Sequence, residues 1–280
     1  RRVLFRSHCN EELFELIVVD NASTKDNPTD LIREFPTIKL IKNNINNGFA
    51  GGNNLGIAHA STPHILLLNS DTYFKEEALV NALTILQENP TIGVVSVQLV
   101  YENGVYQNNA RSFRSITKEI LEINRYLLAL VPYKVRSQYM LNQFFRGDYN
   151  TPCDWVSGAY FMFRKKDLLV LKDHRLDDRF FMYGEDIDLS YRIQQGGYKV
   201  VYFAETKIIH YKGESTKKGS LNYVFVFYNA MIIFAQKHFS KRYAKIFSAK
   251  SPPTSPFKCC NKSIAISLFL SLANLIPKPN

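Results

Sequence analysis

The sequence Ile65-Leu-Leu-Leu-Asn-Ser-Asp-Thr72 contains four consecutive large aliphatic residues that are followed at once by polar ones. Such a run predicts a strand that is buried on both faces, so Asp71 should lie where this strand leaves the core. In an open α/β sheet, ligands bind at that end of the strands. Asp71, with Asn69 beside it, is therefore a candidate ligand for a divalent cation, although capping of the next helix explains the carboxylate equally well.

The composition is that of a globular protein. The 280 residues are 46% hydrophobic, enough to bury one large domain or two small ones. The formal net charge of +10 points to a partner that carries phosphates, which is nucleic acid, an anionic membrane surface or a nucleotide substrate. The four cysteines, at positions 9, 153, 259 and 260, match neither a zinc site nor a disulfide framework. We therefore expect a reducing, cytoplasmic setting.

Apolar strands and helical segments alternate along the chain. The segments with strand character are residues 15–20, 38–41, 65–68, 93–100 and 200–209, and those with helical character are residues 29–35 and 75–87. This alternation predicts an α/β fold with a mostly parallel sheet and helices on both faces.

A loop rich in asparagine and glycine covers residues 43–54. Gly51 and Gly52 allow the backbone to approach a ligand closely, and a helix over residues 53–60 would direct its N-terminal amides at a phosphate. The loop lacks the Gly-x-Gly-x-x-Gly spacing of a dinucleotide site, and a plain loop with turn glycines is the alternative.

The middle of the chain offers two candidate acceptor-binding segments. Trp155, followed by Ser157 and Gly158, can form an apolar platform for a sugar ring, or it can be an ordinary core residue. Residues 116–131 predict a helix within a long insertion, which serves acceptor binding, a mobile lid or simple packing.

Three acids lie close together in residues 180–193. Glu185 and Asp186 fall in the first turn of a predicted helix that ends at Gly196, and Asp188 can pair with Arg192 one turn later. Acids in a first turn complement the helix dipole. Three acids in four residues exceed what one cap requires, so a carboxylate here is a candidate to take a proton from an attacking hydroxyl.

Taken in order, six segments resemble the family 2 glycosyltransferases, and within them the bacterial rhamnosyltransferase-like branch. The segments are Val-Val-Asp20-Asn-Ala-Ser, Gly48-Phe-Ala-Gly-Gly-Asn-Asn, Leu-Leu-Asn69-Ser-Asp71-Thr, Trp155-Val-Ser-Gly-Ala, Tyr183-Gly-Glu-Asp-Ile-Asp-Leu-Ser-Tyr-Arg192 and Ile209-His-Tyr-Lys-Gly-Glu-Ser215. The resemblance covers about residues 15–238 and implies a GT-A fold.

The resemblance also implies an inverting transfer, from a dTDP-, UDP- or GDP-sugar donor with Mg²⁺ or Mn²⁺, to a saccharide or lipid-linked acceptor in surface polysaccharide synthesis. Nucleic acid is not an expected partner. The implied catalytic residues are Asp186, as the base, and Glu185, as its support. The implied metal ligands are Asp71 and His210. The implied donor-binding residues are Asp20, Asn21, Ser23, Gly51, Gly52, Asn53 and Asn69. The implied acceptor-binding residues are Trp155, Ser157 and Gly158.

Family members have a further strand and helix before the strand of Asp20. We therefore expect a chain truncated at its N-terminus, with residues 1–10 as a non-native or disordered leader and residues 11–240 as the catalytic domain. Restoration of the upstream sequence should be needed for activity. Residues 241–280 form a basic and apolar tail that is membrane-associated or disordered. Beyond Ser251, where serine, proline and lysine precede a short apolar run, it is an anchor, a disordered extension or out-of-frame translation.

Residues 223–235 are almost continuously apolar and are followed by lysine and arginine. They predict either a buried packing helix or a helix on an anionic membrane surface, which would place the protein at the inner face of the cell membrane. Two other functions compete with sugar transfer, namely a sugar-nucleotide nucleotidyltransferase and an inactive saccharide-binding homologue. A nucleotidyltransferase needs a basic phosphate-binding loop near its N-terminus, and the asparagine-rich loop contains no such residues.

Overall fold

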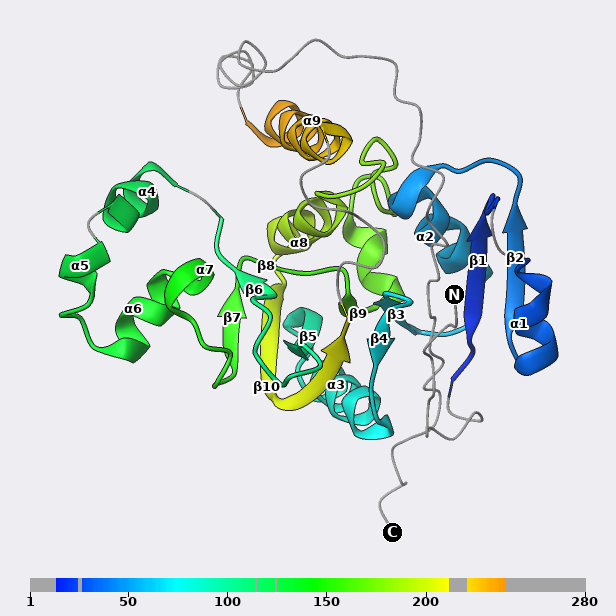
Figure 1. Cartoon of the computed structure of the whole chain (residues 1–280), viewed down its shortest axis with the longest axis horizontal. Helices are drawn as coiled ribbons and strands as arrows, with labels where there is room; N and C mark the ends of the chain where they lie inside the picture. The colour runs from blue at the N-terminus through cyan, green and yellow to red at the C-terminus, as the bar shows by residue number, and fades with distance from the viewer. Residues whose placement is uncertain (1–13, 25–26, 114, 124, 212–220, 240–280) are drawn as a thin grey trace.

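A computed structural model describes residues 14–24, 27–113, 115–123, 125–211 and 221–239 (Figure 1). The predicted leader (residues 1–10) and the predicted tail (residues 241–280) lie outside these ranges, so both remain predictions. In chain order the elements are β1 (Ile17–Asn21), α1 (Thr29–Glu34), β2 (Lys39–Asn43), α2 (Gly48–His59), β3 (His64–Leu68), β4 (Thr72–Tyr73), α3 (Glu76–Glu88), β5 (Ile92–Val100), β6 (Ala110–Arg111), α4 (Ile116–Ile123), α5 (Arg125–Leu128), α6 (Tyr133–Tyr139), α7 (Leu141–Phe144), β7 (Thr151–Cys153), β8 (Trp155–Val156), β9 (Tyr160–Arg164), a 3-10 helix (Lys165–Val170), α8 (Glu185–Gln195), β10 (Lys199–His210) and α9 (Leu221–His238).

The central sheet has the strand order β3-β9-β5-β10-β4, and β7 also pairs with β10. The expected α/β class is confirmed, but the sheet is mixed, so the expectation of mostly parallel pairing was wrong. β9 runs antiparallel to both β3 and β5, whereas β5 and β10 run parallel to each other. The apolar run of β9 shows that this strand is buried, but a uniformly apolar run carries no information on strand direction.

The aliphatic run of β3 is fully buried and serves both faces of the sheet. Leu66 and Leu68 face a core layer to which α3 contributes, while Ile65 and Leu67 face the layer formed with α2 and α8. This alternation follows from the two-residue repeat of a strand. Helices therefore cover both faces of the sheet, and burial on both faces explains why β3 carries no polar residue between its first residue and Asn69.

β1 and β2 form a parallel pair that is not hydrogen-bonded to the central sheet within the described residues. The side chains of β1 nevertheless continue the same two core layers. Val18 belongs to the layer of Leu66 and Leu68, and Val19 belongs to the layer of Ile65 and Leu67. Hydrophobic packing therefore fixes β1, which includes Asp20, relative to the rest of the domain.

The insertion between β6 and β7 differs from its prediction. The expected continuous helix over residues 116–131 is two helices, α4 and α5, and α6 and α7 follow them. Ile120, Ile123 and Leu130 are exposed, so these three side chains are not buried as the prediction of a packing helix requires. Figure 1 shows α4 and α5 projecting away from the sheet.

α9 lies against α8. Ala230 and Phe234 pack on Phe180 beside the start of α8, while Val224 and Tyr228 are exposed. The helix is therefore a packing helix on one face, with exposed apolar side chains on the other. In the described ranges, none of the helices combines the length and the apolar character needed to cross a bilayer.

Gly48 starts α2 in a conformation that an L-residue with a side chain rarely adopts. Its φ is +76°, and a Cβ atom here would collide with the backbone carbonyl of Phe181. We expect Gly48→Ala to lower the free energy of unfolding by about 2–5 kcal/mol, because left-handed strain adds to the clash. The matched control is Gly104→Ala, since Gly104 has φ +79° and open space around it. The control should lose only about 1–2 kcal/mol in urea unfolding, and equal losses in both variants would contradict the role of the close contact.

Candidate functional site

Three strands of the central sheet end at one edge. β3 and β5 run in the same direction because β9 is antiparallel to both, and β10 is parallel to β5. Asn69 and Asp71 follow β3, and His210 is the last residue of β10. Polar residues from separate parts of the chain thus gather at the carboxyl ends of the strands, which is the expected place for a ligand.

The short strand β4 carries the chain across the sheet and places Asp71 beside His210. β4 pairs antiparallel with the end of β10, with Thr72 opposite His210, and the Tyr211 N–H donates to the Asp71 carbonyl at 2.9 Å. His210 Nε2 lies 3.3 Å from Asp71 Oδ1 and 3.4 Å from Asn69 Nδ2. The structure therefore brings together the two residues that were predicted to bind a metal.

The Asp71 and His210 side chains are chemically suited to a divalent cation. Adjacent ligands of an octahedral ion with bonds of 2.0–2.1 Å lie about 3 Å apart, close to the 3.3 Å between His210 Nε2 and Asp71 Oδ1. The described residues contain no group of three or more histidine, cysteine or acidic side chains that could hold a metal. The residues present thus fit a cation that is held by two protein ligands and completed by water and substrate phosphates.

Asp186 lies in the first turn of α8, two residues after the N-cap Gly184, whose φ is +86°. Its Oδ2 accepts the Gly158 N–H at 3.1 Å, and its Oδ1 accepts the Ile187 N–H at 2.8 Å. Burial raises the pKa of Asp186, and the hydrogen bonds from Gly158 and Ile187 only partly oppose this effect. A carboxylate with a raised pKa is a better proton acceptor than an ordinary aspartate.

Glu185 is more deeply enclosed than Asp186. Its side chain is only 7% exposed and its Oε2 atom has no hydrogen-bond partner. Burial, followed by the charge of Asp186, raises the pKa of Glu185 well above its usual value. Two neighbouring carboxyl groups thus differ in surroundings, because Asp186 accepts two backbone N–H groups that Glu185 lacks.

The predicted acceptor-side residues adjoin Asp186. Gly158 contacts it directly, and the Ser157 N–H donates to the Asn109 carbonyl at 3.0 Å. Trp155, in β8, pairs across from Arg111 of β6, whose guanidinium lies 5.2 Å from the indole centroid. Burial still raises the pKa of Asp186, and the positive charge of Arg111 opposes this rise only in part. Sequence reasoning missed Arg111, because a single arginine in a polar stretch gives no signal.

Asp20 and Asn21 are the last two residues of β1, and both are buried. The Asp20 carboxylate accepts the Ser23 N–H at 3.0 Å, and the Asn21 amide donates to the Gly48 carbonyl at 2.8 Å. Asn21 therefore fixes the loop before α2. Ser23 Oγ is buried without a hydrogen-bond partner. Nucleotide recognition by Asp20, Asn21 and Ser23 remains a prediction.

The prediction for the glycine-rich loop was wrong about where the helix starts. α2 begins at Gly48, five residues earlier than expected, so Gly51, Gly52 and Asn53 lie inside the helix and are buried. Asn53 Nδ2 donates to the Phe49 carbonyl at 2.8 Å. The first helical N–H groups therefore belong to residues near Gly48. The N-terminus of α2 does not direct its N–H groups at a phosphate from Asn53, as was predicted.

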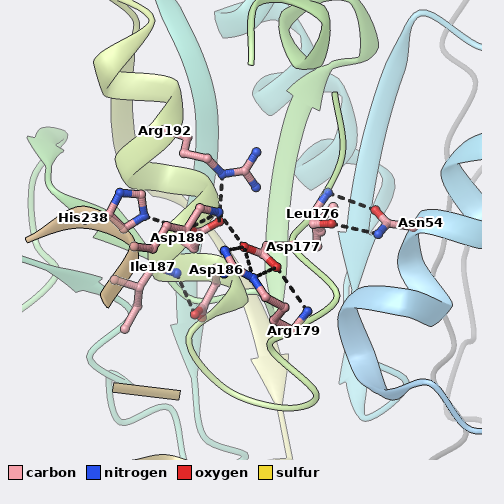
Figure 2. A network of polar contacts seen from close by, with 10 residues as sticks. Asn54, Leu176, Asp177, Arg179, Asp186, Ile187, Asp188, Arg192 and His238 are labelled. Atoms are coloured by element: carbon pink, nitrogen blue, oxygen red, sulfur yellow. Dashed lines mark hydrogen bonds and ion pairs between the residues drawn. The ribbon is translucent and has the colours of Figure 1, made fainter. Parts of the chain in front are cut away.

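The third acid of the cluster has a structural role (Figure 2). Asp188 is fully buried and binds Arg192 Nε at 2.7 Å, as its spacing predicted. It also binds Lys237 Nζ at 2.9 Å and His238 Nε2 at 2.7 Å, both at the end of α9. Burial alone would raise the pKa of Asp188, but these partners hold it below its usual value. Asp188 thus joins α9 to α8.

Further polar contacts hold the loop before α8. Lys237 also binds Asp177 at 2.7 Å. Arg179 pairs with the same carboxylate (Figure 2). The Asn54 side chain of α2 exchanges two hydrogen bonds with the backbone of Leu176, at 2.8 and 2.9 Å. α2 and α9 therefore both hold this loop in place.

Comparison with known proteins finds relatives over most of the chain. It is 22% identical over 246 residues to the N-acetylglucosaminyl-diphospho-decaprenol L-rhamnosyltransferase of Mycobacterium tuberculosis, covering 83% of this chain and 78% of the relative. It is also 22% identical over 221 residues to rhamnosyltransferase WbbL of Escherichia coli, covering 75% of this chain and 78% of that protein.

Among solved structures, the crystal structure of GalNAc-T7 with UDP, GalNAc and Mn²⁺ superposes with a TM-score of 0.52 at 14% identity. The match covers 80% of this chain and 44% of the solved chain, so this protein spans less than half of that structure's length. A likeness at this identity shows the fold alone, and it confirms the expected GT-A architecture.

The sequence model described as "Glycosyl transferase family 2" matches residues 2–169. The matched stretch includes Asp71 and Trp155 and ends before Asp186 and His210. Because this match covers more than half of the 280 residues, the protein belongs to glycosyl transferase family 2.

Proposed function

We propose that the protein transfers a sugar from a nucleotide-activated donor to a saccharide or lipid-linked acceptor, with inversion at the anomeric carbon. One observation supports this proposal most strongly. Asp71, which follows β3, lies beside His210, which ends β10. Asp186 contacts Gly158 in the turn that leads into β9, and this turn lies beside the end of β3. One edge of the sheet thus carries both a candidate cation site and a candidate base.

Asp71 and His210 are proposed to hold Mg²⁺ or Mn²⁺. A cation bound there neutralises charge that develops on the departing diphosphate. Asp71 contributes a carboxylate, His210 contributes an imidazole nitrogen, and Asn69 lies within 3.4 Å of the same nitrogen. The donor diphosphate is proposed to bind on this side of the site, with Asp20 and Ser23 toward the nucleotide.

Asp186 is proposed to act as the base. The acceptor hydroxyl oxygen forms a bond to the anomeric carbon as the bond from that carbon to the diphosphate oxygen breaks. The hydroxyl proton moves to Asp186 Oδ, and the nucleoside diphosphate leaves with the bonding electrons. One base is sufficient for a single displacement, and a single displacement inverts the anomeric centre. The Gly158 and Ile187 N–H groups orient the carboxylate.

The acceptor is proposed to lie over Trp155 and the Ser157-Gly158 turn, on the side of Asp186. The names of both relatives describe rhamnosyl transfer, and one of them names a diphospho-decaprenol acceptor. Rhamnose as the donor sugar and a lipid diphosphate as the acceptor anchor are therefore the first candidates. Arg111, beside Trp155, offers a cation on this side of the site.

An anionic membrane surface is retained as a proposed partner, but the described end of α9 does not support the reason first given for it. Lys237 is only 14% exposed and pairs with Asp177 and Asp188. Its charge is therefore not available to lipid headgroups. The exposed apolar side chains of Val224, Phe227 and Tyr228 are the part of α9 that remains to meet a membrane.

The central test replaces the proposed base. Asp186→Asn keeps the shape of the side chain and removes its ability to accept a proton, so we expect sugar transfer by the full-length protein to fall by about 10²–10⁴-fold. Transfer is measured with radiolabelled dTDP-, UDP- and GDP-sugars, Mn²⁺ and a lipid-diphosphate acceptor. Asp178→Asn, at an exposed acid in the loop before α8, is the control and should retain activity. An active Asp186→Asn variant would refute the assignment.

Asp71 is tested through its cation. Asp71→Asn removes a charged oxygen ligand, and we expect transfer to fall by about 10²-fold or more, with partial recovery at high Mn²⁺ concentration. EDTA should abolish transfer by the wild type, and Mn²⁺ should restore it. The control is Asp30→Asn, which changes an exposed acid of α1 outside the proposed site. It should leave the Mn²⁺ dependence of transfer unchanged. Full wild-type activity in EDTA would exclude a metal-dependent mechanism.

Glu185 provides a test through stability. Its pKa is raised in the folded state, so it contributes stability while protonated at low pH, and this contribution is lost as pH rises toward the folded-state value. Glu185→Gln removes the penalty of a buried charge at high pH. We expect its Tm to exceed that of the wild type by a few degrees at about pH 8 and by less at about pH 5, since about 1 kcal/mol shifts Tm by roughly 2–4 °C in a domain of this size. A Tm difference that does not change with pH would contradict the raised pKa.

A further inference from the structure

Gln107 binds His210 at two points. Its Oε1 atom lies 3.0 Å from His210 Nδ1, and its Nε2–H group donates to the backbone carbonyl of the same histidine. Gln107 is only 2% exposed and follows β5 in the chain, 103 residues before His210. A buried side chain that holds both the backbone and the ring of one residue restricts that ring to a single orientation.

The backbone contact decides which end of the Gln107 amide faces the imidazole. A carbonyl oxygen only accepts hydrogen bonds, so the amide nitrogen must face the His210 carbonyl. The amide oxygen must then face His210 Nδ1. Because that oxygen only accepts, Nδ1 must carry the hydrogen, and the neutral ring leaves Nε2 with a free lone pair.

The lone pair of Nε2 points at the carboxylate of Asp71. The two atoms lie 3.3 Å apart, and neither of them carries a hydrogen in this tautomer. Two acceptors at this distance repel each other unless a positive charge lies between them. The Asn69 Nδ2 group, 3.4 Å from Nε2, satisfies the lone pair only weakly at that separation.

The backbone on both sides holds Gln107 in place. The Gln107 N–H donates to the Leu99 carbonyl at 2.8 Å, and Tyr106 bridges to Val100 at the end of β5. β5 in turn pairs with β10 up to Ile209, one residue before the histidine. The distance between Gln107 and His210 is therefore set by strand pairing.

We propose that Gln107 is a positioning residue that fixes the tautomer of His210, so that its Nε2 lone pair and the Asp71 carboxylate face a divalent cation together. This inference rests on the proposed cation site and adds a residue that does not itself touch the cation. An outer residue that fixes the tautomer of a ligand histidine commonly changes metal affinity by about 10–100-fold.

Three variants separate positioning from simple support. Gln107→Leu removes both contacts. Gln107→Glu keeps an oxygen that accepts from Nδ1–H but cannot donate to the His210 carbonyl. Gln98→Leu is the matched control. Gln98 is also a buried glutamine, it lies within β5, and its side chain donates to the backbone carbonyl of Gly147 at 2.7 Å.

Two measurements are made on the full-length protein without donor. The first reads the His210 tautomer from ring ¹⁵N chemical shifts of histidine-labelled protein at about pH 8, with His210→Gln used for assignment. The second measures affinity for Mn²⁺ alone, by the electron paramagnetic resonance signal of free Mn²⁺. We expect Nδ1–H in the wild type, in Gln107→Glu and in Gln98→Leu, and a mixture of tautomers in Gln107→Leu.

Mn²⁺ affinity should fall by about 10–100-fold in Gln107→Leu and stay within about threefold of the wild type in Gln98→Leu and Gln107→Glu. An Nε2–H tautomer in the wild type would overturn the proposal, as would equal affinities of Gln107→Leu and the wild type. Equal losses in Gln107→Glu and Gln107→Leu would show that Gln107 only supports the His210 backbone, which also overturns it. Absence of Mn²⁺ binding in a wild type with the expected tautomer would instead refute the proposed cation site, and with it this role.

Discussion

The antiparallel pairing of β4 with the end of β10 is the constraint on which the site depends. β3 and β4 lie at opposite ends of the strand order, yet only Asn69, Ser70 and Asp71 separate them in sequence. The chain therefore passes from β3 to β4 within a few residues, at the side of the sheet where β5 and β10 end and β9 begins. This crossing carries Asp71 from the strand that precedes it to the strand that ends in His210. Asp71 would lie beside the outermost strand β3 if the chain did not continue into β4. Because it does, its carboxylate faces the imidazole of His210 at the end of β10.

Much of this arrangement was predictable from local patterns. The four aliphatic residues of β3 predict its burial, and the acids before Asp188 predict the start of α8. Both predictions are confirmed. The direction of β9 and the start of α2 were not predictable in the same way. A uniformly apolar strand reads alike in both directions, and Gly48 begins a helix only because its positive φ and the Phe181 carbonyl fit together. Gln107 and Arg111 had no signal at all, because their roles depend on partners far away in sequence.

The acids of α8 show how surroundings assign different roles to one residue type. Asp188 is the most buried, and its cationic partners lower its pKa. Glu185 has no cation beside it among the described residues, and one of its oxygens has no partner, so burial raises its pKa. Asp186 lies between these extremes, with two backbone N–H groups that hold its carboxylate in place. Only Asp186 combines a fixed orientation with a raised pKa and a position at the sheet edge. These are the properties that a base needs.

The contacts of Asp188 also connect the outermost helix to this site. A fully buried carboxylate is costly unless its charge is compensated, and Lys237 and His238 supply much of that compensation from α9. Without α9, Asp188 would keep only the Nε contact of Arg192, whose two terminal nitrogens are buried without partners. Since Asp186 and Asp188 lie in the same helical turn, the position of α9 and the orientation of the proposed base depend on one another. α9 is therefore part of the support of the site, and any contact that its exposed face makes acts on a helix that holds in place the turn of α8 with the proposed base.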